Sequence, residues 1–338
     1  MTDAGHQLAI KALLGRAGLR AEGRLAIRRL SNGQSNLTFL IESESGRKWV
    51  ARRPPLGTIL ESAHDVDREA RIMRALAETD VPVPTVLAQL RSDHVPWVLL
   101  GHIEGTVVED VHVARGLSAA HRHGLGPRLA QRLAGIHAVD LGGTGLLDLS
   151  SRAPYAQRQL RRWTRQWEES RTRPLPSLEK LTARLVEGAV RLRPQESSVL
   201  VHGDFHLRNV IVQDAEVVGV LDWELSTLGH PLADLGTLLA YWPMPGEMPS
   251  ADDSPSLAPG WASRADLVEA YAQASGTAVD DYPYWHSLGL WKVAIIAEGV
   301  RRRVLDHPQN EAAGGAPTAE VINALVARAH DAVTAWGN

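Results

Sequence analysis

Five polar side chains with the chemistry of a catalytic site are clustered around two apolar runs in the stretch VLVHGDFHLRNVIVQDAEVVGVLDWE. They are His202, Asp204, His206, Asn209 and Asp222. Carboxylate and amide oxygens suit a hard divalent cation, and a loop carboxylate can accept a proton from a hydroxyl group. The apolar runs would fold well enough without these residues, so their presence indicates chemistry.

The spacing of the two apolar runs predicts a β-hairpin. Residues 210–212 and 217–221 are joined by a polar connection of hairpin length. Folding brings Asn209 and Asp222 to the open end, where cross-strand Cβ atoms are about 5 Å apart and one oxygen from each could share a cation. Asp204 precedes Asn209 by five residues. In protein-kinase-like phosphotransferases, residues in this order accept the proton of the acceptor hydroxyl and bind metal.

Two other interpretations of the stretch stay open. His202, Asp204 and His206 stand at alternate positions and could supply nitrogen and oxygen ligands to the metal of a hydrolase. That interpretation leaves Asn209 and Asp222 unexplained, whereas a kinase site uses both. A pseudokinase would bind nucleotide or a partner without catalysis. Loss of one of the three kinase-type residues would favour it, and all three are present.

The elements that must position these residues fall into two parts. Before residue 102 the pattern predicts a helix, three short strands, a second helix and two further extended segments, which form an α+β lobe with an antiparallel sheet. The last strand breaks at Gly101 and Gly105, which marks a boundary. Beyond it the periodicity is mostly helical. We therefore predict a bilobal α+β fold with domains at 1–101 and 102–338.

The composition is that of an ordinary globular protein, with 338 residues, 44% of them hydrophobic and 22% charged. A formal net charge of -3 gives no overall basic field for nucleic acid. No apolar run approaches the roughly 18 residues of a membrane span, and the first residues lack the apolar region of a signal peptide. The absence of Cys excludes thiolate chemistry. We expect a cytoplasmic protein that binds neither nucleic acid nor a membrane, in an oligomeric state that is left open.

The motifs HGDFHLRN and VLDWE resemble the paired signatures of the aminoglycoside phosphotransferase and choline kinase superfamily. The chain most resembles the branch that includes the kinase-like domain at the N-terminus of certain acyl-CoA dehydrogenases. Other matching motifs are LSNGQSNLTFLI, WVARRPP, DREARIMRAL, GIHAVDLGGTGL and GHPLADLGTLLAYW. The resemblance covers nearly the whole chain, in order.

The resemblance implies a protein-kinase-like fold, with a nucleotide-binding lobe at 1–101 and a catalytic and substrate-binding lobe at 102–338. It implies transfer of the γ-phosphoryl group of ATP to a hydroxyl group of a small molecule, with Mg²⁺. Asp204 would be the catalytic base, and Asn209 and Asp222 would be the magnesium ligands.

Two further residues gain roles near the catalytic loop. Asp234 would hold this loop by accepting backbone hydrogen bonds, although an acid in the first turn of a helix also has a purely electrostatic explanation. His202 would organise the loop backbone. His137 lies on an apolar helical face and is better explained as a brace in the core than as a metal ligand.

In the smaller lobe, the resemblance implies that Glu69 pairs with a cation that contacts the α and β phosphates. This cation is Lys in the family and falls on Arg52 here, which keeps the charge in a longer, forked group. The alternative for Arg52 is a solvated strand charge. The phosphate loop SNGQSN has the single glycine Gly33, so Ser35, Asn36 and backbone groups would supply the contacts.

The segment from Arg152 to Arg173 gives an indication of the acceptor. It carries seven arginines against Glu168 and Glu169. Tyr155, Trp163 and Trp167 lie near one helical face, beside a stripe made of Arg158, Arg162 and Arg165. Aminoglycosides are polycations and need carboxylates, whereas this surface suits an anion with an apolar part, such as a hydroxyacyl-CoA. Alternatively, the Trp side chains pack in the core and the arginines are solvated.

Overall fold

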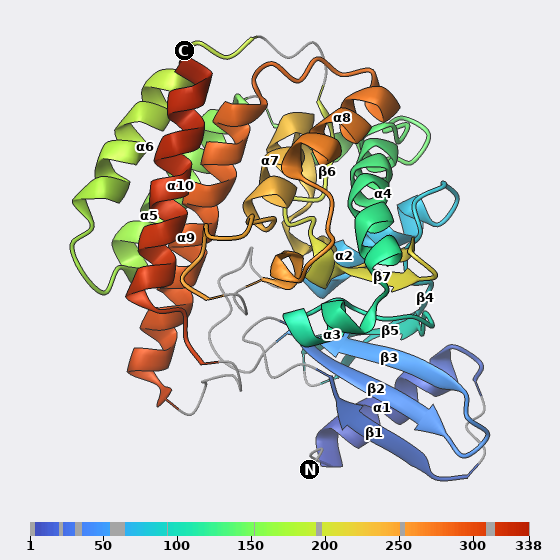
Figure 1. Ribbon diagram of the computed structural model, residues 1–338. Helices are drawn as coiled ribbons and strands as arrows, with labels where there is room; N and C mark the ends of the chain where they lie inside the picture. Colours follow the sequence, from blue (N-terminus) through green and yellow to red (C-terminus); the bar gives the residue numbers. More distant parts are fainter. Residues whose placement is uncertain are drawn as a thin grey trace. The chain divides into compact units, whose positions relative to one another are not determined.

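The computed structural model describes residues 4–19, 23–30, 36–54, 65–92, 94–151, 153–193, 198–250, 254–308 and 315–337. The chain forms two compact units, which Figure 1 draws in the colours of the sequence. The first comprises Met1–Gly105 with Val218–Glu224, and the second comprises Thr106–Val217 with Leu225–Asn338. A short segment from late in the chain, which contains Asp222, therefore belongs to the first unit.

A five-stranded antiparallel sheet is the framework of the first unit. In the order β1-β2-β3-β5-β4, it contains β1 (Leu25–Arg29), β2 (Leu37–Ser43), β3 (Lys48–Arg53), β5 (Val95–Gly101) and β4 (Val86–Ser92). Side chains alternate between the two faces of a sheet. Phe39 and Trp97 lie on the face that α1 (Ala4–Arg16) covers, where Ile10 and Leu13 of the helix complete an apolar cluster.

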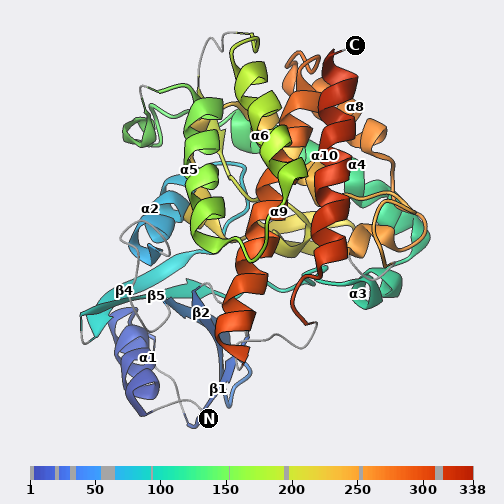
Figure 2. The same ribbon diagram turned by 90° about the vertical axis from the view of Figure 1, so that its left-hand side faces the viewer.

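The other face of this sheet carries Arg52. The residue is next to Ala51, a member of the cluster under α1, so alternation points Arg52 to the opposite side. The helix α2 (Val66–Leu76) begins after Asp65, whose side chain caps its first turn. Figure 2 shows α1 and α2 on opposite sides of the β4–β5 pair. Glu69 lies on the buried face of α2 with the apolar residues of that helix.

The second unit is built mainly of helices. These are α3 (Val111–Gly116), α4 (Ala119–His137), α5 (Tyr155–Ser170), α6 (Pro176–Ala189), α7 (Pro231–Ala240), α8 (Arg264–Ser275), α9 (Tyr282–Asp306) and α10 (Ala319–Gly337). The central helix α9 packs against α5, α6, α7 and α10. Helices α7 and α9 approach each other so closely at Gly236 that a Cβ there would lie 2.2 Å from the Trp285 carbonyl oxygen. The mostly helical second part of the fold is thus as predicted.

Short strands carry the polar stretch of the sequence. The strands β6 (Val199–Val201) and β9 (Thr227–Gly229) pair antiparallel. The strands β7 (Val210–Gln213) and β8 (Glu216–Val220) form the predicted hairpin. Its turn consists of two residues with positive φ, 50° at Asp214 and 63° at Ala215, as a tight hairpin turn requires. The hairpin therefore continues the chain directly from Asn209.

Within the described ranges, no helix is both long and apolar enough to cross a bilayer.

Candidate active site

Arg52 is the centre of a charged cluster in the first unit. Its Nη1 donates a hydrogen bond to Glu69 Oε1 at 2.6 Å, and its Nη2 donates to Asp222 Oδ1 at 3.1 Å. Arg52 is only 9% exposed and Glu69 only 1%. A planar guanidinium can reach two carboxylates in this way, whereas an ammonium group is a single point of charge. Arg52 therefore contacts Glu69, with which it was predicted to pair. Arg52 is not a solvated strand charge.

The charges of this cluster are strongly coupled. Burial alone would lower the pKa of Arg52, but the carboxylates of Glu69 and Asp222 outweigh burial and raise it. Burial raises the pKa of Glu69, with Asp222 and Glu224 acting in the same direction and Arg52 opposing them. Two carboxylates, those of Glu69 and Asp222, thus share the Arg52 guanidinium, which favours binding of a further cation.

Asp222 follows β8 in a conformation that few side chains adopt. Its φ is 65°, in the left-handed region, which residues other than glycine adopt uncommonly, Asp and Asn most readily among them. Its side chain is 26% exposed, so the carboxylate keeps access to solvent while one oxygen binds Arg52. The next residue, Trp223, donates its backbone N–H to Glu69 Oε1 at 3.3 Å. An uncommon backbone conformation of this kind is typical of functional positions.

Asn36 joins the same cluster from the start of β2. Its Nδ2 donates to Glu224 Oε2 at 3.3 Å, and the side chain is buried. Its Oδ1 is buried and has no hydrogen-bond partner within the described part of the chain. The other predicted members of the phosphate loop, Gly33 and Ser35, lie outside the described residues.

Asp204 lies in the second unit, on the loop of residues 202–209 that follows β6. Its Oδ2 accepts a hydrogen bond from Asn209 Nδ2 at 3.2 Å and lies 3.4 Å from His206 Nε2. Its Oδ1 is buried without a hydrogen-bond partner among the described residues. Burial alone would raise the pKa of Asp204, but His206 and Lys292 outweigh it and hold this pKa well below its usual range. The carboxylate is therefore ionised at neutral pH and is anchored through Oδ2.

Asn209 is oriented by the same loop. Its Nδ2 also donates to the backbone oxygen of Asp204, at 2.9 Å. Since the amide nitrogen is engaged with Asp204, the amide oxygen is the atom that remains for a cation. Asn209 and Asp222 thus both offer hard oxygen donors, the type that Mg²⁺ prefers.

Asp234, in the first turn of α7, binds the backbone of the 202–209 loop. Its Oδ2 accepts from the N–H of His202, and its Oδ1 accepts from the N–H of Gly203 at 2.8 Å. His137 lies behind it, with Nε2 3.3 Å from Asp234 Oδ2 and Nδ1 2.7 Å from Tyr271 Oη. Of the two explanations for Asp234, the loop-holding one is correct, and His137 is a buried brace as expected.

The histidines of HGDFH serve the loop backbone. His202 Nδ1 accepts the N–H of Asp204 at 3.2 Å, and His206 Nδ1 accepts the N–H of Arg208 at 3.2 Å. These lone pairs are engaged and cannot ligate a metal at the same time. Within the described residues, no group of three or more His, Asp and Glu side chains is arranged to hold a metal ion. The geometry therefore gives the hydrolase interpretation no support.

The aromatic face of α5 packs into the protein. Trp163 and Trp167 are 8% and 4% exposed, and α5 packs against α6 and α9. The guanidinium of Arg162 lies 5.3 Å from the centroid of the Trp163 ring, and Arg158 donates to the Leu228 oxygen at 2.7 Å. The alternative that placed the Trp side chains in the core is therefore correct. Helical periodicity identified the face but not the neighbour that it contacts.

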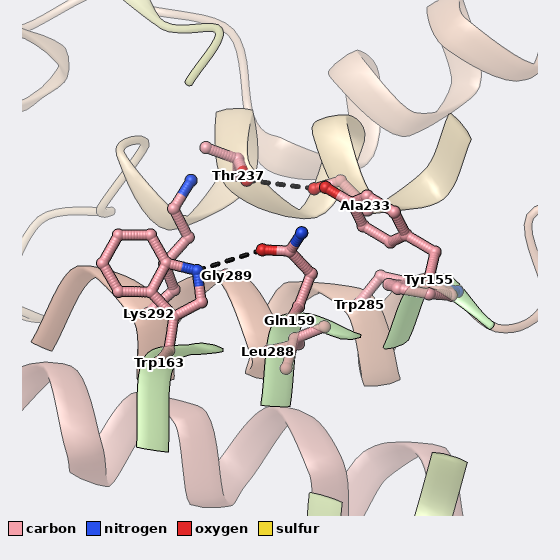
Figure 3. A pocket seen from close by; sticks show the side chains of 9 residues that line it. All are labelled: Tyr155, Gln159, Trp163, Ala233, Thr237, Trp285, Leu288, Gly289 and Lys292. Atoms are coloured by element: carbon pink, nitrogen blue, oxygen red, sulfur yellow. Dashed lines mark hydrogen bonds between the residues drawn. The ribbon is translucent and has the colours of Figure 1, made fainter. Parts of the chain in front are cut away.

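Lys292 is a buried residue near the 202–209 loop that was not predicted from the sequence. This residue of α9 is buried, its Nζ donates to the Gly203 oxygen, and it lines a small cavity with Trp163 and Thr237 (Figure 3). The signal that could have indicated it is a single charged residue in the apolar helical run LGLWKVAIIA.

The chain belongs to the phosphotransferase enzyme family, whose sequence model matches residues 26–291. It is similar to acyl-CoA dehydrogenase family member 10 of Mus musculus, with 35% identity over 305 residues, which are 87% of this chain and 28% of that protein. It is also similar to acyl-CoA dehydrogenase family member 11 of Homo sapiens, with 31% identity over 297 residues, 85% of this chain and 37% of that protein. The chain thus spans about a third of the length of these relatives.

Solved structures share the fold. A protein of Ralstonia eutropha assigned to the aminoglycoside phosphotransferases is 29% identical, with a TM-score of 0.70 over 98% of this chain and 97% of that one. The aminoglycoside phosphotransferase APH(4)-Ia, solved as a mutant in a ternary complex with ADP and hygromycin B, is 14% identical, with a TM-score of 0.63 over 98% of both chains. The predicted α+β, kinase-like fold class is confirmed.

Proposed function

We propose that this protein transfers the γ-phosphoryl group of ATP to a hydroxyl group of a small molecule, in a reaction that requires Mg²⁺. The observation that carries the proposal is the way in which the Asp204 carboxylate is held. Asn209 and His206 hold one carboxylate oxygen, and the other is buried and has no partner among the described residues. A base that must accept one proton from an incoming hydroxyl needs an oriented, ionised carboxylate that the hydroxyl can reach, and the Asp204 side chain is held in place while 23% of its surface stays exposed.

In the proposed step, the acceptor oxygen forms a bond to the γ-phosphorus, and the bond from that phosphorus to the β–γ bridging oxygen breaks, so that ADP leaves. The proton of the acceptor hydroxyl passes to the Asp204 carboxylate. His206 and Asn209 keep the carboxylate in place while its charge is neutralised. Asp234 holds the backbone that carries Asp204, through the N–H groups of two preceding residues.

The nucleotide contacts are proposed from the first unit. Arg52, oriented by Glu69, would contact the α and β phosphates, with Gly33, Ser35 and Asn36 at the phosphate loop. Asn209 and Asp222 would hold Mg²⁺, which when bound neutralises phosphate charge. In this assignment residues 1–101 bind nucleotide, and residues 102–338 supply the base and the acceptor site. ADP in the complex of APH(4)-Ia supports the choice of nucleotide.

For the acceptor we propose an anionic hydroxylated metabolite, such as a hydroxyacyl-CoA. Two observations support this class. Arg161, Arg162 and Arg165 of α5 are exposed, and this surface would repel a polycation. The relatives from mouse and human are named as acyl-CoA dehydrogenase family members. An aminoglycoside is the competing acceptor, because the solved structures with this fold include aminoglycoside phosphotransferases.

The experiment is a measurement of ADP release with Mg²⁺ and ATP across three groups of acceptors: hydroxyacyl-CoA thioesters, neutral hydroxylated metabolites, and aminoglycosides including hygromycin B. We expect the anionic thioesters to give the highest kcat/KM, and Arg162→Glu to raise their KM without altering the KM for ATP. Efficient turnover of an aminoglycoside with no response to the thioesters would refute the acceptor class. Binding of Mg²⁺–ATP without turnover of any acceptor would favour a pseudokinase.

A further inference from the structure

Lys292 is a buried cation that the proposed reaction does not yet use. It lies in the middle of α9, in a run of apolar residues, and is only 8% exposed. Its Nζ donates a hydrogen bond to the backbone oxygen of Gly203. The same ammonium group lies 5.5 Å from the centroid of the Trp163 ring, within the range of a cation–π contact. Figure 3 shows the two side chains next to each other at one end of a small cavity.

The hydrogen bond of Lys292 fixes a peptide unit that already has unusual geometry. Gly203 has a φ of 86°, and a Cβ at this position would lie 2.7 Å from the Leu225 oxygen, so only glycine fits. The Gly203 N–H is bound by Asp234 at 2.8 Å. The peptide that joins Gly203 to Asp204 has its oxygen bound by Lys292 and its N–H bound by His202. Three side chains thus determine the direction in which the Asp204 backbone leaves the glycine.

The Trp163 ring connects the Lys292 ammonium group to helix α5. Gln159 Oε1 accepts a hydrogen bond from Trp163 Nε1 at 3.0 Å, which fixes the plane of the indole that faces the Lys292 ammonium group. The adjoining cavity has a volume of about 20 Å³, and Thr237 of α7 contributes to its lining. The ammonium group is therefore closely surrounded by α5, α7 and the 202–209 loop.

Packing alone does not explain a lysine at this position. An isolated ammonium group is costly to bury, and replacing a buried charge by an apolar side chain of similar shape is often neutral or stabilising. Burial does lower the pKa of Lys292, while the nearby carboxylates of Asp204 and Asp234 act in the opposite direction. A methionine would fill the same space without this penalty.

We propose that Lys292 is a positioning residue, which holds the Gly203–Asp204 peptide and thereby aims the Asp204 carboxylate at the acceptor. The inference rests on the proposed function, because it assigns Asp204 the task of accepting a proton. Lys292 acts through the backbone of the loop and contacts neither nucleotide nor acceptor. Its loss should therefore lower kcat and leave the affinity for ATP unchanged.

The test compares Lys292→Met with Lys180→Met, the same substitution at an exposed lysine of α6. We expect Lys292→Met to lower kcat about 10- to 100-fold, the scale expected when a reacting group is displaced by about 1 Å. The KM for ATP and the melting temperature should stay close to those of the wild type. Lys292→Arg and Lys292→Gln keep a donor for the Gly203 oxygen and should recover part of kcat. Lys180→Met should behave like the wild type.

Amide hydrogen exchange separates this inference from the proposed function, since it needs no acceptor. Lys292→Met should speed exchange of the amides of residues 202–204 in the folded protein, and Lys180→Met should not. If the wild type transfers no phosphoryl group but the exchange rates change as expected, the function is wrong and the positioning role stands. Unchanged kcat and unchanged exchange in Lys292→Met would overturn the inference. So would a melting temperature lowered to the same degree in the Met, Arg and Gln variants, with kcat per folded molecule unchanged.

Discussion

The guanidinium of Arg52 binds Asp222, with 3.1 Å between Nη2 and Oδ1, while its other nitrogen binds Glu69 at 2.6 Å. Asp222 is also the residue that we propose as a magnesium ligand. Arg52 and Mg²⁺ would therefore compete for, or share, the same carboxylate. A lysine at this position could keep the pair with Glu69 and release Asp222, because its charge lies on one nitrogen at the end of a shorter side chain, whereas Arg52 places a separate nitrogen on each carboxylate.

Arg52→Lys should lower the Mg²⁺ concentration needed for half-maximal activity, and it should keep most of the activity. Arg52→Ala should lose much of it, because the phosphates lose their positive partner. The Mg²⁺ dependence of both activity and ATP-induced thermal stabilisation checks this expectation. Arg47→Lys, at an exposed position before β3, is the matched control and should change neither. Equal activity in the Ala, Lys and wild-type proteins would show that Arg52 has no part in the reaction.

Asp222→Asn should weaken the binding of Mg²⁺–ATP, because it removes a charged ligand of a hard cation. We expect the variant to need more Mg²⁺ for the same rise in melting temperature with ATP. The control is Asp214→Asn in the turn of the same hairpin, where φ is 50° and Asn is well tolerated. A Mg²⁺ dependence identical to that of the wild type would count against Asp222 as a ligand.

The parts of the site that are local in sequence were predictable. The order of Asp204, Asn209 and Asp222 pointed to the phosphotransferase family to which the chain belongs. A loop, two short strands and a turn are local in sequence, so the spacing of these residues could be interpreted without tertiary contacts. The apolar pattern also predicted the hairpin and the mostly helical second half. The roles proposed for these residues in catalysis and metal binding stay predictions.

The contacts that depend on tertiary structure were not predictable. The Lys292 ammonium group meets the loop 89 residues away in sequence, at the Gly203 oxygen, and no local pattern encodes such a contact. For the same reason the aromatic face of α5 could be recognised from its periodicity but not assigned to the core. Trp163 and Trp167 are buried because α6 and α9 pack on that face.

A salt-bridge cluster after α7 gives a test of stability against pH. Glu247 accepts two hydrogen bonds from the guanidinium of Arg264 and one from the N–H of Met244 at 2.9 Å, and it also pairs with Arg328. Burial alone would raise the pKa of Glu247, but Arg264 and its other partners outweigh burial and lower it to about 2. A depressed pKa means that the folded state favours the charged form.

Glu247 should therefore stabilise the protein above its ordinary pKa of 4.5, and this contribution should be lost as the pH falls from there toward 2. We expect Glu247→Gln to melt below the wild type at pH 7, and the difference to shrink at pH 3. Thermal unfolding of both proteins across this range measures the effect. Glu269→Gln, on the exposed surface of α8, is the control. A difference that does not depend on pH would contradict ion pairing as its source.

The role of Asp204 as the catalytic base is tested by phosphoryl transfer in Asp204→Asn, compared with Asp306→Asn at the exposed end of α9. Asn keeps the shape of the side chain and cannot accept the proton of the acceptor hydroxyl. We expect Asp204→Asn to lose nearly all ADP release that depends on an acceptor, while Mg²⁺–ATP still raises its melting temperature as in the wild type. Asp306→Asn should retain full activity. Wild-type turnover in Asp204→Asn would rule out Asp204 as the catalytic base.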